Sequence, residues 1–215
     1  MWQRAKIVGS EQAAEDIKSI VVRPEHWTPH KAGQHYELRM PGSEFMRKYS
    51  VVSSPSRGRE LEFGVQLIPG GVLSPKLWAA DIDDEIEIQG PWGESFIWEP
   101  RMSGPLVLLG AGSGITPLLS ICDAYHDAGG NDCTFIMSAK NERRVMRYES
   151  LRDSLVTRFT EQDGRISEVF LKEYTKPTPA TLCYICGPDG FIDDMVDFLI
   201  ELGFPEVGIK SERFI

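Results

Sequence analysis

The chain has 215 residues, of which 41% are hydrophobic and 26% charged, a composition that suits one large domain or two small ones. It contains no apolar run long enough for a transmembrane helix, and its first residues lack the apolar segment of a signal peptide. From these two features we expect no membrane partner and a cytoplasmic location, and because the net charge is −9 we expect no nucleic acid partner.

The first part of the chain, residues 1–101, predicts short β-strands separated by turns. Apolar and polar residues alternate in six segments punctuated by proline and glycine: 5–10, 17–24, 34–41, 48–55, 61–68 and 85–91. One short helix is predicted over residues 74–80. Many short strands without long helices indicate a small antiparallel barrel.

The second part, residues 102–215, follows a polar linker flanked by prolines and shows a different pattern. Strands are predicted over residues 106–109, 133–139, 181–187 and 208–214, and helices over 117–129, 148–159 and 189–203. Strands that alternate with helices imply a parallel sheet with right-handed crossovers.

A glycine-rich turn, GAGSG at residues 110–114, lies between the first of these strands and its helix. Glycine lets the backbone approach a ligand closely, and a helix N-terminus offers N–H groups and a positive dipole to an anion. We interpret the turn as a phosphate cradle, with a tight turn without a ligand as the alternative. The spacing departs from the usual dinucleotide fingerprint, because Ile115 stands where a third glycine is expected, and it matches neither a P-loop nor a nucleophile elbow.

Two further segments follow strands of the same predicted sheet, at residues 138–141 and 186–190. Ligands of open α/β sheets bind beyond the C-terminal ends of the strands. The three segments together therefore predict a crevice between the barrel and the sheet, where backbone and the Cys186 thiol are exposed.

The four cysteines are expected to be reduced thiols, as is usual in cytoplasm. Cys183 and Cys186 form a C-x-x-C pattern, but residues three apart on a strand point to opposite faces and cannot share a metal. The four histidines show no ligand spacing, so no metal site is predicted.

Three motifs together resemble the ferredoxin–NADP reductase superfamily: RKYS at residues 47–50, GAGSGITP at 110–117 and CGPDGF at 186–191. Their order and spacing match over essentially the whole chain. The resemblance implies a two-domain fold, with an antiparallel Greek-key β-barrel for flavin at residues 1–101 and a Rossmann-like parallel α/β sheet for NAD(P)H at residues 102–215.

The resemblance also implies a flavin site, with FAD favoured over FMN. Arg47 would pair with the pyrophosphate, Tyr49 would stack on the isoalloxazine, and Ser50 would hydrogen-bond flavin N5. Further flavin-binding residues implied are Val51, Gly71, Val72, Leu73, Ser74 and Phe214, the last covering the flavin until nicotinamide displaces it. Each has an ordinary alternative, such as a surface arginine, a core tyrosine, a type II turn after Pro69, or plain packing of the C-terminal strand.

For NAD(P)H, the resemblance implies that the glycine turn holds the pyrophosphate and nicotinamide side, through Gly112, Ser113, Gly114, Ile115 and Thr116. It also implies that a second segment contributes Cys186, Gly187, Pro188 and Asp189. Ser138 and Lys140 would meet the adenosine ribose, and Arg165 would read a phosphate. A serine and a cation there favour NADPH over NADH, since NAD sites usually place an acid on the 2′-hydroxyl, although lysine lacks the planar fork of arginine. The basic run at residues 140–147 favours the same choice.

The catalytic residues implied are Ser50, Cys186 and Glu212. Cys186 would lie beside nicotinamide C4 as a steric and polarising group, because a buried thiol stays protonated. The implied function is an NAD(P)H oxidoreductase that passes hydride to FAD and electrons to a separate acceptor, such as ferredoxin, flavodoxin or an oxygenase component, because no cysteines have iron–sulfur spacing.

Two alternatives remain open for the function. The chain could be an electron-transfer subunit of a larger complex, or a regulatory nucleotide-binding module that transfers no hydride. Residues 39–59 carry five basic groups against Glu44 alone. They form either a solvated surface or a docking face for an acidic electron carrier.

Overall fold

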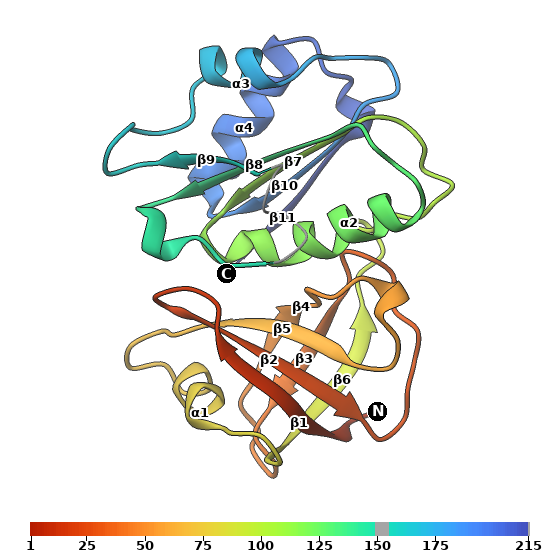
Figure 1. The fold of residues 1–215 in the computed structure, drawn as a ribbon, viewed down its shortest axis with the longest axis vertical. Coiled ribbons are helices and arrows are strands. Elements are labelled where there is room, and N and C mark those ends of the chain that lie inside the picture. Colours follow the sequence, from red (N-terminus) through yellow and green to blue (C-terminus); the bar gives the residue numbers. More distant parts are fainter. Residues whose placement is uncertain (149–154, 215) are drawn as a thin grey trace.

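The computed structural model describes residues 1–148 and 155–214, and in them two β-sheets lie one above the other (Figure 1). Helix α2 (Ile115–Asp127) lies between the two sheets. The first sheet is antiparallel and the second is parallel. The expected two-domain fold, a barrel followed by an α/β sheet, is therefore confirmed.

The first sheet has the strand order β4-β3-β6-β1-β2-β5. Its strands are β1 (Gln3–Gln12), β2 (Ile17–Pro24), β3 (His35–Arg39), β4 (Met46–Ser50), β5 (Leu61–Gln66) and β6 (Glu85–Trp92). An isolated bridge between Val51 and Phe63 joins the two edge strands, so the sheet closes on itself. Closure removes the exposed strand edges that an open sheet would leave.

The barrel core follows from the two-residue period of its strands. In β6, Ile86 and Ile88 are fully buried while Glu85 and Glu87 face outward. Helix α1 (Ser74–Ala79) covers part of the barrel and buries Leu77, and a short 3-10 helix, η1, spans Pro55–Arg57. The predicted short helix over residues 74–80 is confirmed.

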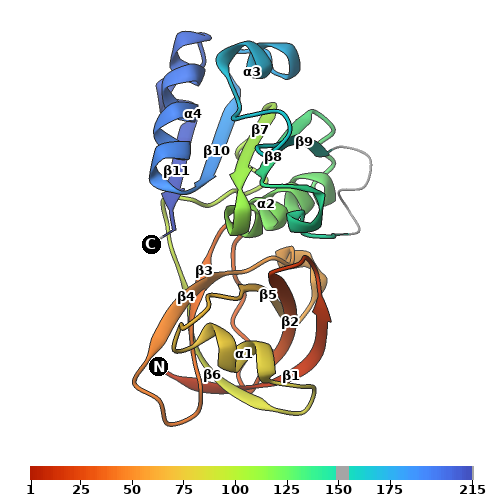
Figure 2. The same cartoon turned by 90° about the vertical axis from the view of Figure 1, so that its left-hand side faces the viewer.

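The second sheet has the order β11-β10-β7-β8-β9. Its strands are β7 (Leu106–Ala111), β8 (Cys133–Ala139), β9 (Leu155–Phe159), β10 (Leu182–Gly187) and β11 (Ile209–Arg213). The other helical elements are α3 (Glu168–Tyr174), α4 (Asp189–Glu201), η2 (Gly112–Gly114), η3 (Glu142–Arg144) and η5 (Glu206–Gly208). Helix α2 covers one face of this sheet and α3 and α4 cover the other (Figure 2).

The two cysteines of the C-x-x-C pattern lie on opposite faces of β10, as predicted. Cys183 packs in the cluster beneath α4, and Cys186 packs in the cluster beneath α2. Both thiols are fully buried, and residues three apart on a strand cannot reach a common ligand.

The predicted helix over residues 148–159 is wrong where the structure describes it. Residues 155–159 form β9, which pairs in parallel with β8, and residues 149–154 lie outside the described part of the chain. Leu155, Val156 and Phe159 suit the half-buried surface of an edge strand better than a helix.

Helix α3 was not anticipated from the sequence, although its start carries a signal. The hydroxyl of Ser167 accepts a hydrogen bond from the Phe170 N–H at 3.3 Å, which caps the first turn. Glu168 in the first turn and Lys172 in the last turn complement the helix dipole.

Helix α2 packs against both sheets. Ten of its residues are buried, and six of these share one apolar cluster with Ala32, Val52 and Phe96 of the barrel half and with Phe135 of β8. A helix that is apolar around its whole circumference must be enclosed on all sides. The shared cluster therefore fixes how the barrel sits on the parallel sheet.

Polar contacts complete this junction along the length of α2. The Ser120 hydroxyl donates to the carbonyl of Ser53 at 2.9 Å, and Arg57 pairs with the buried Asp123 at 2.9 Å. One turn further on, Ser54 and Ser56 donate to Asp127 at 2.8 and 2.5 Å.

We predict that Gly64→Ala weakens this junction. A Cβ at Gly64 of β5 would lie 2.7 Å from Cγ2 of Thr116 on α2, so one of the two elements must shift. We expect a loss of about 1–3 kcal/mol in the free energy of unfolding, measured with urea.

The matched test is Gly64→Ala combined with Thr116→Ser, which removes the clashing methyl group but keeps the hydroxyl that donates to the Ser113 carbonyl. The double variant should recover part of the lost stability. If Gly64→Ala were as stable as the parent, the proposed tight packing at this point would be wrong.

Candidate functional site

The sheet register brings the predicted nucleotide-binding segments together at one edge. Gly110 of β7 lies opposite Cys186 of β10, and Cys186 lies opposite Glu212 of β11. On the other side of β7, Ala111 lies opposite Ser138 of β8. These residues form a row across the C-terminal ends of adjacent strands, where open parallel sheets bind ligands.

The glycine turn is shaped by close backbone packing. A Cβ at Gly114 would lie 2.3 Å from the carbonyl oxygen of Cys186, so only glycine fits there. Gly112 adopts φ 56°, which favours glycine, and nothing lies within 4 Å of its Cβ position. The turn thus offers open backbone at Gly112 and Ser113, held against β10.

The side chains of the two residues that follow the turn are both buried. Ile115 is fully buried in the shared core, and Thr116 is 3% exposed with its hydroxyl bonded to the Ser113 carbonyl at 3.0 Å. Their side chains therefore shape the turn from beneath, and only backbone is left for a ligand.

The second segment lies at the start of α4. Gly187 ends β10, where a Cβ would lie 3.0 Å from the Cβ of Ala111, and Pro188 is the N-cap residue of α4. Asp189 is exposed and pairs with Arg213 at 3.0 Å. Gly187 therefore keeps the segment close to the glycine turn.

The fully buried Cys186 and the half-buried Glu212 lie side by side at this edge. Burial and the nearby Glu212 carboxylate hold the pKa of the Cys186 thiol well above its usual range. This thiol is fully buried, so the expectation of a thiol exposed at the crevice is wrong, because the apolar cluster beneath α2 encloses it. Phe214 packs against the same cluster.

Glu212 is the most perturbed acid of the site. Burial raises its pKa to about 7, and the positive charge of Lys48 partly opposes this shift. Its Oε2 is buried and has no hydrogen-bond partner within the described residues. A half-buried carboxyl that has a pKa near neutral and one buried, unpartnered oxygen is typical of a functional position.

The influence of Lys48 on Glu212 also connects the two domains, because Lys48 lies on β4 of the barrel. On the same strand Tyr49 is half-buried against the barrel core, and burial raises its pKa to about 12. Ser50 is buried, and Arg47 is exposed with its guanidinium donating to the Met46 carbonyl at 2.8 Å. The end of β11 therefore lies within electrostatic reach of β4, the predicted flavin strand.

The remaining predicted flavin residues divide into buried and exposed ones. Val51 is fully buried, and its N–H donates to the Gln34 carbonyl at 3.0 Å. Neither its side chain nor its N–H is therefore free for a ligand. In the turn before α1, Leu73 and Ser74 are buried, and the Ser74 hydroxyl accepts from the N–H of Ile68. Val72 faces outward, and Gly71 donates to the Ile68 carbonyl.

At the predicted adenosine end, the basic run divides in a way the sequence did not indicate. Arg144 pairs with Asp16 at 2.5 Å and Arg143 pairs with Glu15 at 3.7 Å, so both connect the sheet domain to the barrel. Lys140 is exposed beside the buried Ser138.

A second cation lies at the same end of the sheet. Arg165 is exposed and pairs with Asp194 at 3.7 Å. Glu161 also lies here, accepting from Asn141 at 3.0 Å, and sequence reasoning missed it because it belongs to the segment expected to follow a helix.

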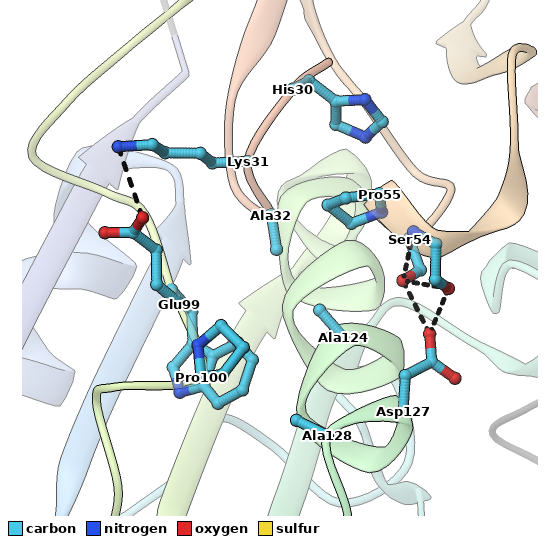
Figure 3. A pocket seen from close by; sticks show the side chains of 12 residues that line it. His30, Lys31, Ala32, Ser54, Pro55, Glu99, Pro100, Ala124, Asp127 and Ala128 are labelled. Atoms are coloured by element: carbon cyan, nitrogen blue, oxygen red, sulfur yellow. Dashed lines mark hydrogen bonds and ion pairs between the residues drawn. The ribbon is translucent and has the colours of Figure 1, made fainter.

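A cavity of about 330 Å³ lies elsewhere, between the barrel and the C-terminal half of α2 (Figure 3). Ala32, Pro55 and Ala124 line it together with His30, whose Nδ1 is buried without a partner in the described part of the chain. None of the predicted cofactor-binding residues lines this cavity.

Comparison with known proteins agrees with this geometry. Residues 5–97 match the family described as the oxidoreductase FAD-binding domain, and residues 108–197 match the oxidoreductase NAD-binding domain. Together the two matches cover most of the chain. The chain belongs to the ferredoxin reductase-like superfamily of FAD- and NAD-binding oxidoreductases.

Two relatives within this superfamily are informative. The reductase component of propane 2-monooxygenase from Mycolicibacterium goodii is 26% identical, with 98% of this chain and 67% of the relative covered. The flavohemoprotein of Bacillus subtilis is 31% identical, with 99% of this chain and 60% of the relative covered. The chain thus spans about two thirds or less of the length of these relatives.

Solved structures show the same fold at low sequence identity. Phthalate dioxygenase reductase superposes with a TM-score of 0.86 at 21% identity, covering 99% of this chain and 68% of that one. The FAD/NAD-binding domain of nitric oxide dioxygenase from Vibrio cholerae superposes with a TM-score of 0.85 at 22% identity, covering 99% of this chain and 98% of that domain.

FAD and NAD(P) are the cofactors expected of this superfamily, and the structure fits them at two points. The glycine turn has the close packing and open backbone of an anion cradle at a helix N-terminus. Glu212 supplies an unpartnered buried oxygen at the row of strand ends nearest β4. No helix in the described residues is long and apolar enough to cross a membrane.

We predict that Glu212→Gln changes how stability depends on pH. Since the folded pKa of Glu212 is about 7 against an ordinary 4.5, the folded chain binds more protons than the unfolded chain between these values. The free energy of unfolding therefore falls as pH rises through this window, by about 2–3 kcal/mol from this group.

Glutamine stays neutral at every pH, so the free energy of unfolding of the variant should not fall through this window. Above about pH 7 the variant should therefore be more stable than the parent. Urea unfolding of both proteins at several pH values measures the difference. Glu206→Gln, at an exposed position, is the control. Parallel pH profiles for Glu212→Gln and the parent would contradict the raised pKa.

Proposed function

We propose that this chain is a flavin-dependent oxidoreductase that takes hydride from NAD(P)H onto FAD and passes electrons to a separate acceptor. One observation carries the proposal: the row of Gly110, Cys186 and Glu212 ends within electrostatic reach of Lys48, on the barrel strand that also carries Tyr49. When bound, reduced nicotinamide donates hydride and the flavin ring accepts it.

The residues of the chain bind and orient the two rings. Residues 1–101 form the flavin-binding domain, where Tyr49 supplies a flat half-buried surface and Ser50 a buried hydroxyl. Residues 102–215 form the nucleotide-binding domain, where the glycine turn holds the pyrophosphate. Cys186 and Phe214 limit the space for the nicotinamide and exclude water from it.

The acceptor of the electrons is a separate protein carrier or oxygenase component. Support comes from one relative, the reductase component of propane 2-monooxygenase. On this chain, residues 39–59 present the exposed cations Arg47, Lys48 and Arg59, and the side chain of Phe45 in the same segment is also exposed. A basic surface suits an acidic carrier, whose association slows as salt rises.

The test is an anaerobic titration of the purified protein with NADPH and with NADH, followed by the flavin absorbance. A reductase bleaches at about one equivalent, and addition of an acidic carrier such as ferredoxin or flavodoxin restores the oxidised spectrum. A protein that binds nucleotide but carries no flavin would instead be the regulatory module. If the oxidised flavin spectrum returned only when a stoichiometric partner chain was present, the protein would be an electron-transfer subunit.

We predict that Cys186→Ala slows hydride transfer more than it weakens nucleotide binding. Removing the thiol leaves a gap beside the predicted nicotinamide position, so the ring is less well oriented. Stopped-flow flavin reduction should fall by about tenfold or more, while the Kd for the nucleotide changes by less than about threefold.

Cys183→Ala is the matched control, because this equally buried thiol lies on the opposite face of β10. It should leave the rate of flavin reduction unchanged. An unaltered rate in Cys186→Ala would remove this thiol from the site.

We further propose NADPH as the preferred donor, on the strength of Ser138, Lys140 and Arg165, and we predict that Lys140→Ala reduces the preference. Loss of a charged contact to the 2′-phosphate should lower kcat/KM for NADPH by about tenfold and leave that for NADH nearly unchanged. Arg143→Ala is the control from the same basic run, because Arg143 pairs with Glu15 of the barrel. Equal kcat/KM for both coenzymes in the parent would contradict the preference.

A further inference from the structure

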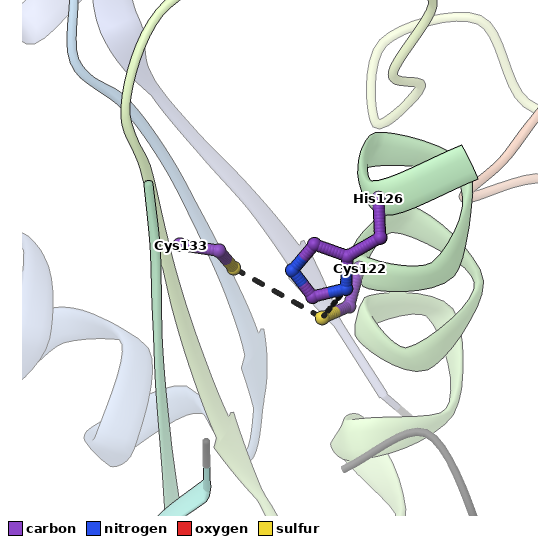
Figure 4. A group of neighbouring side chains, drawn as sticks. All are labelled: Cys122, His126 and Cys133. Atoms are coloured by element: carbon purple, nitrogen blue, oxygen red, sulfur yellow. Dashed lines mark hydrogen bonds between the residues drawn. The ribbon is translucent and has the colours of Figure 1, made fainter. Parts of the chain in front are cut away.

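Helix α2 carries a second cluster of reactive side chains at the end opposite to the glycine turn. Cys122 and His126 lie one turn apart on one face of α2, and Cys133 is the first residue of β8 (Figure 4). Sγ of Cys122 lies 4.0 Å from Sγ of Cys133 and 3.9 Å from Nδ1 of His126. The three donor atoms all lie within 4.8 Å of one another.

These separations are close to those of a tetrahedral metal site. With Zn–S bonds of about 2.3 Å and a Zn–N bond of about 2.0 Å, two sulfur ligands are about 3.8 Å apart, and sulfur and nitrogen about 3.5 Å apart. The two separations from Cys122 Sγ exceed these values by about 0.2 and 0.4 Å, and the exposed His126 side chain would have to approach Cys133 by at most about 1.3 Å for all three donors to bind one ion. The i, i+4 spacing of Cys122 and His126 already holds two donors on the same face of the helix.

The surroundings of the cluster leave one coordination position open. Cys122 is 1% exposed and belongs to the apolar core, Cys133 is half-buried, and His126 is exposed. A cation held by the three side chains would thus have apolar packing on one side and solvent on the other. A water molecule can supply the fourth ligand from the solvent side.

We propose that Cys122, His126 and Cys133 form a binding site for a thiolate-seeking divalent cation of the Zn²⁺ class. Two sulfur atoms and an imidazole select Zn²⁺ over Mg²⁺ or Ca²⁺, which take oxygen ligands. Binding replaces the thiol protons with the metal ion, so each bound cation releases protons to solvent.

The position of this site indicates a structural role, separate from hydride transfer. Cys122 and His126 lie about 10 and 16 Å along the axis of α2 from its first residue, so the cation would lie well away from the glycine turn at the start of this helix. It would tie the end of α2 to the start of β8, directly beside Asp127, which accepts hydrogen bonds from Ser54 and Ser56 of the barrel half. The bound cation would therefore stabilise the end of α2 on which the barrel rests.

The test is titration of the reduced holoprotein with Co²⁺, a spectroscopic probe for Zn²⁺ sites. We expect d–d bands of a tetrahedral thiolate complex at wavelengths beyond the flavin absorption, saturating at one equivalent and abolished by excess Zn²⁺. Cys133→Ser and His126→Ala should lose these bands, and both positions are accessible enough for the variants to fold. Cys183→Ser, on the opposite face of the sheet, should keep them.

A second readout is thermal unfolding. Zn²⁺ at about 100-fold above its Kd should raise the Tm of the parent by about 5 °C and leave that of His126→Ala unchanged. Absence of tetrahedral bands in the parent, or bands and Tm shifts of equal size in His126→Ala, would overturn the proposal. Neither readout depends on hydride transfer, so failure here is distinct from failure of the proposed oxidoreductase function.

Discussion

The enclosure of α2 between the two sheets is the constraint on which the rest of the molecule depends. Its apolar side chains complete the core of the parallel sheet, and they also pack against the barrel half. Because the glycine turn forms the start of this helix, the position of the turn relative to the barrel is fixed by the same packing. The hydrophobic contact that joins the domains therefore also places the predicted nucleotide cradle.

A second constraint is electrostatic and acts at the row of strand ends. Glu212 is half-buried beside Cys186, and the positive charge of Lys48 on the barrel partly offsets the cost of burying its carboxyl. Burying a carboxyl without a full complement of hydrogen bonds costs free energy. Such a cost is tolerated at sites where a ligand or a proton completes the arrangement, which agrees with the proposed site.

Much of the fold could be predicted from the sequence because the patterns there are strong and local. The alternation in residues 85–91 and the apolar run at 106–109 predicted strands of the right kind, and the opposite facing of Cys183 and Cys186 followed from strand geometry. The helix predicted to include residues 155–159 was wrong because an edge strand and a short helix give similar apolar patterns. Its partner β8 decides between them, and that pairing is not visible in a local window.

The candidate site was predictable in outline and less so in detail. The glycine turn and the Cys186 segment meet as expected, but sequence motifs gave no indication that Ile115, Thr116 and Val51 would be buried. The cluster of Cys122, His126 and Cys133 was also missed. Two of its members are close in sequence, but the third arrives through the pairing of β8 with β7.

The ion pairs of Arg143 and Arg144 with Glu15 and Asp16 have a consequence for protein engineering. The loop next to the predicted adenosine pocket also fastens the sheet domain to the barrel. Replacing this loop to switch the coenzyme would also remove these ion pairs between the domains. A redesign of coenzyme selectivity must therefore supply new contacts between the barrel and the sheet domain.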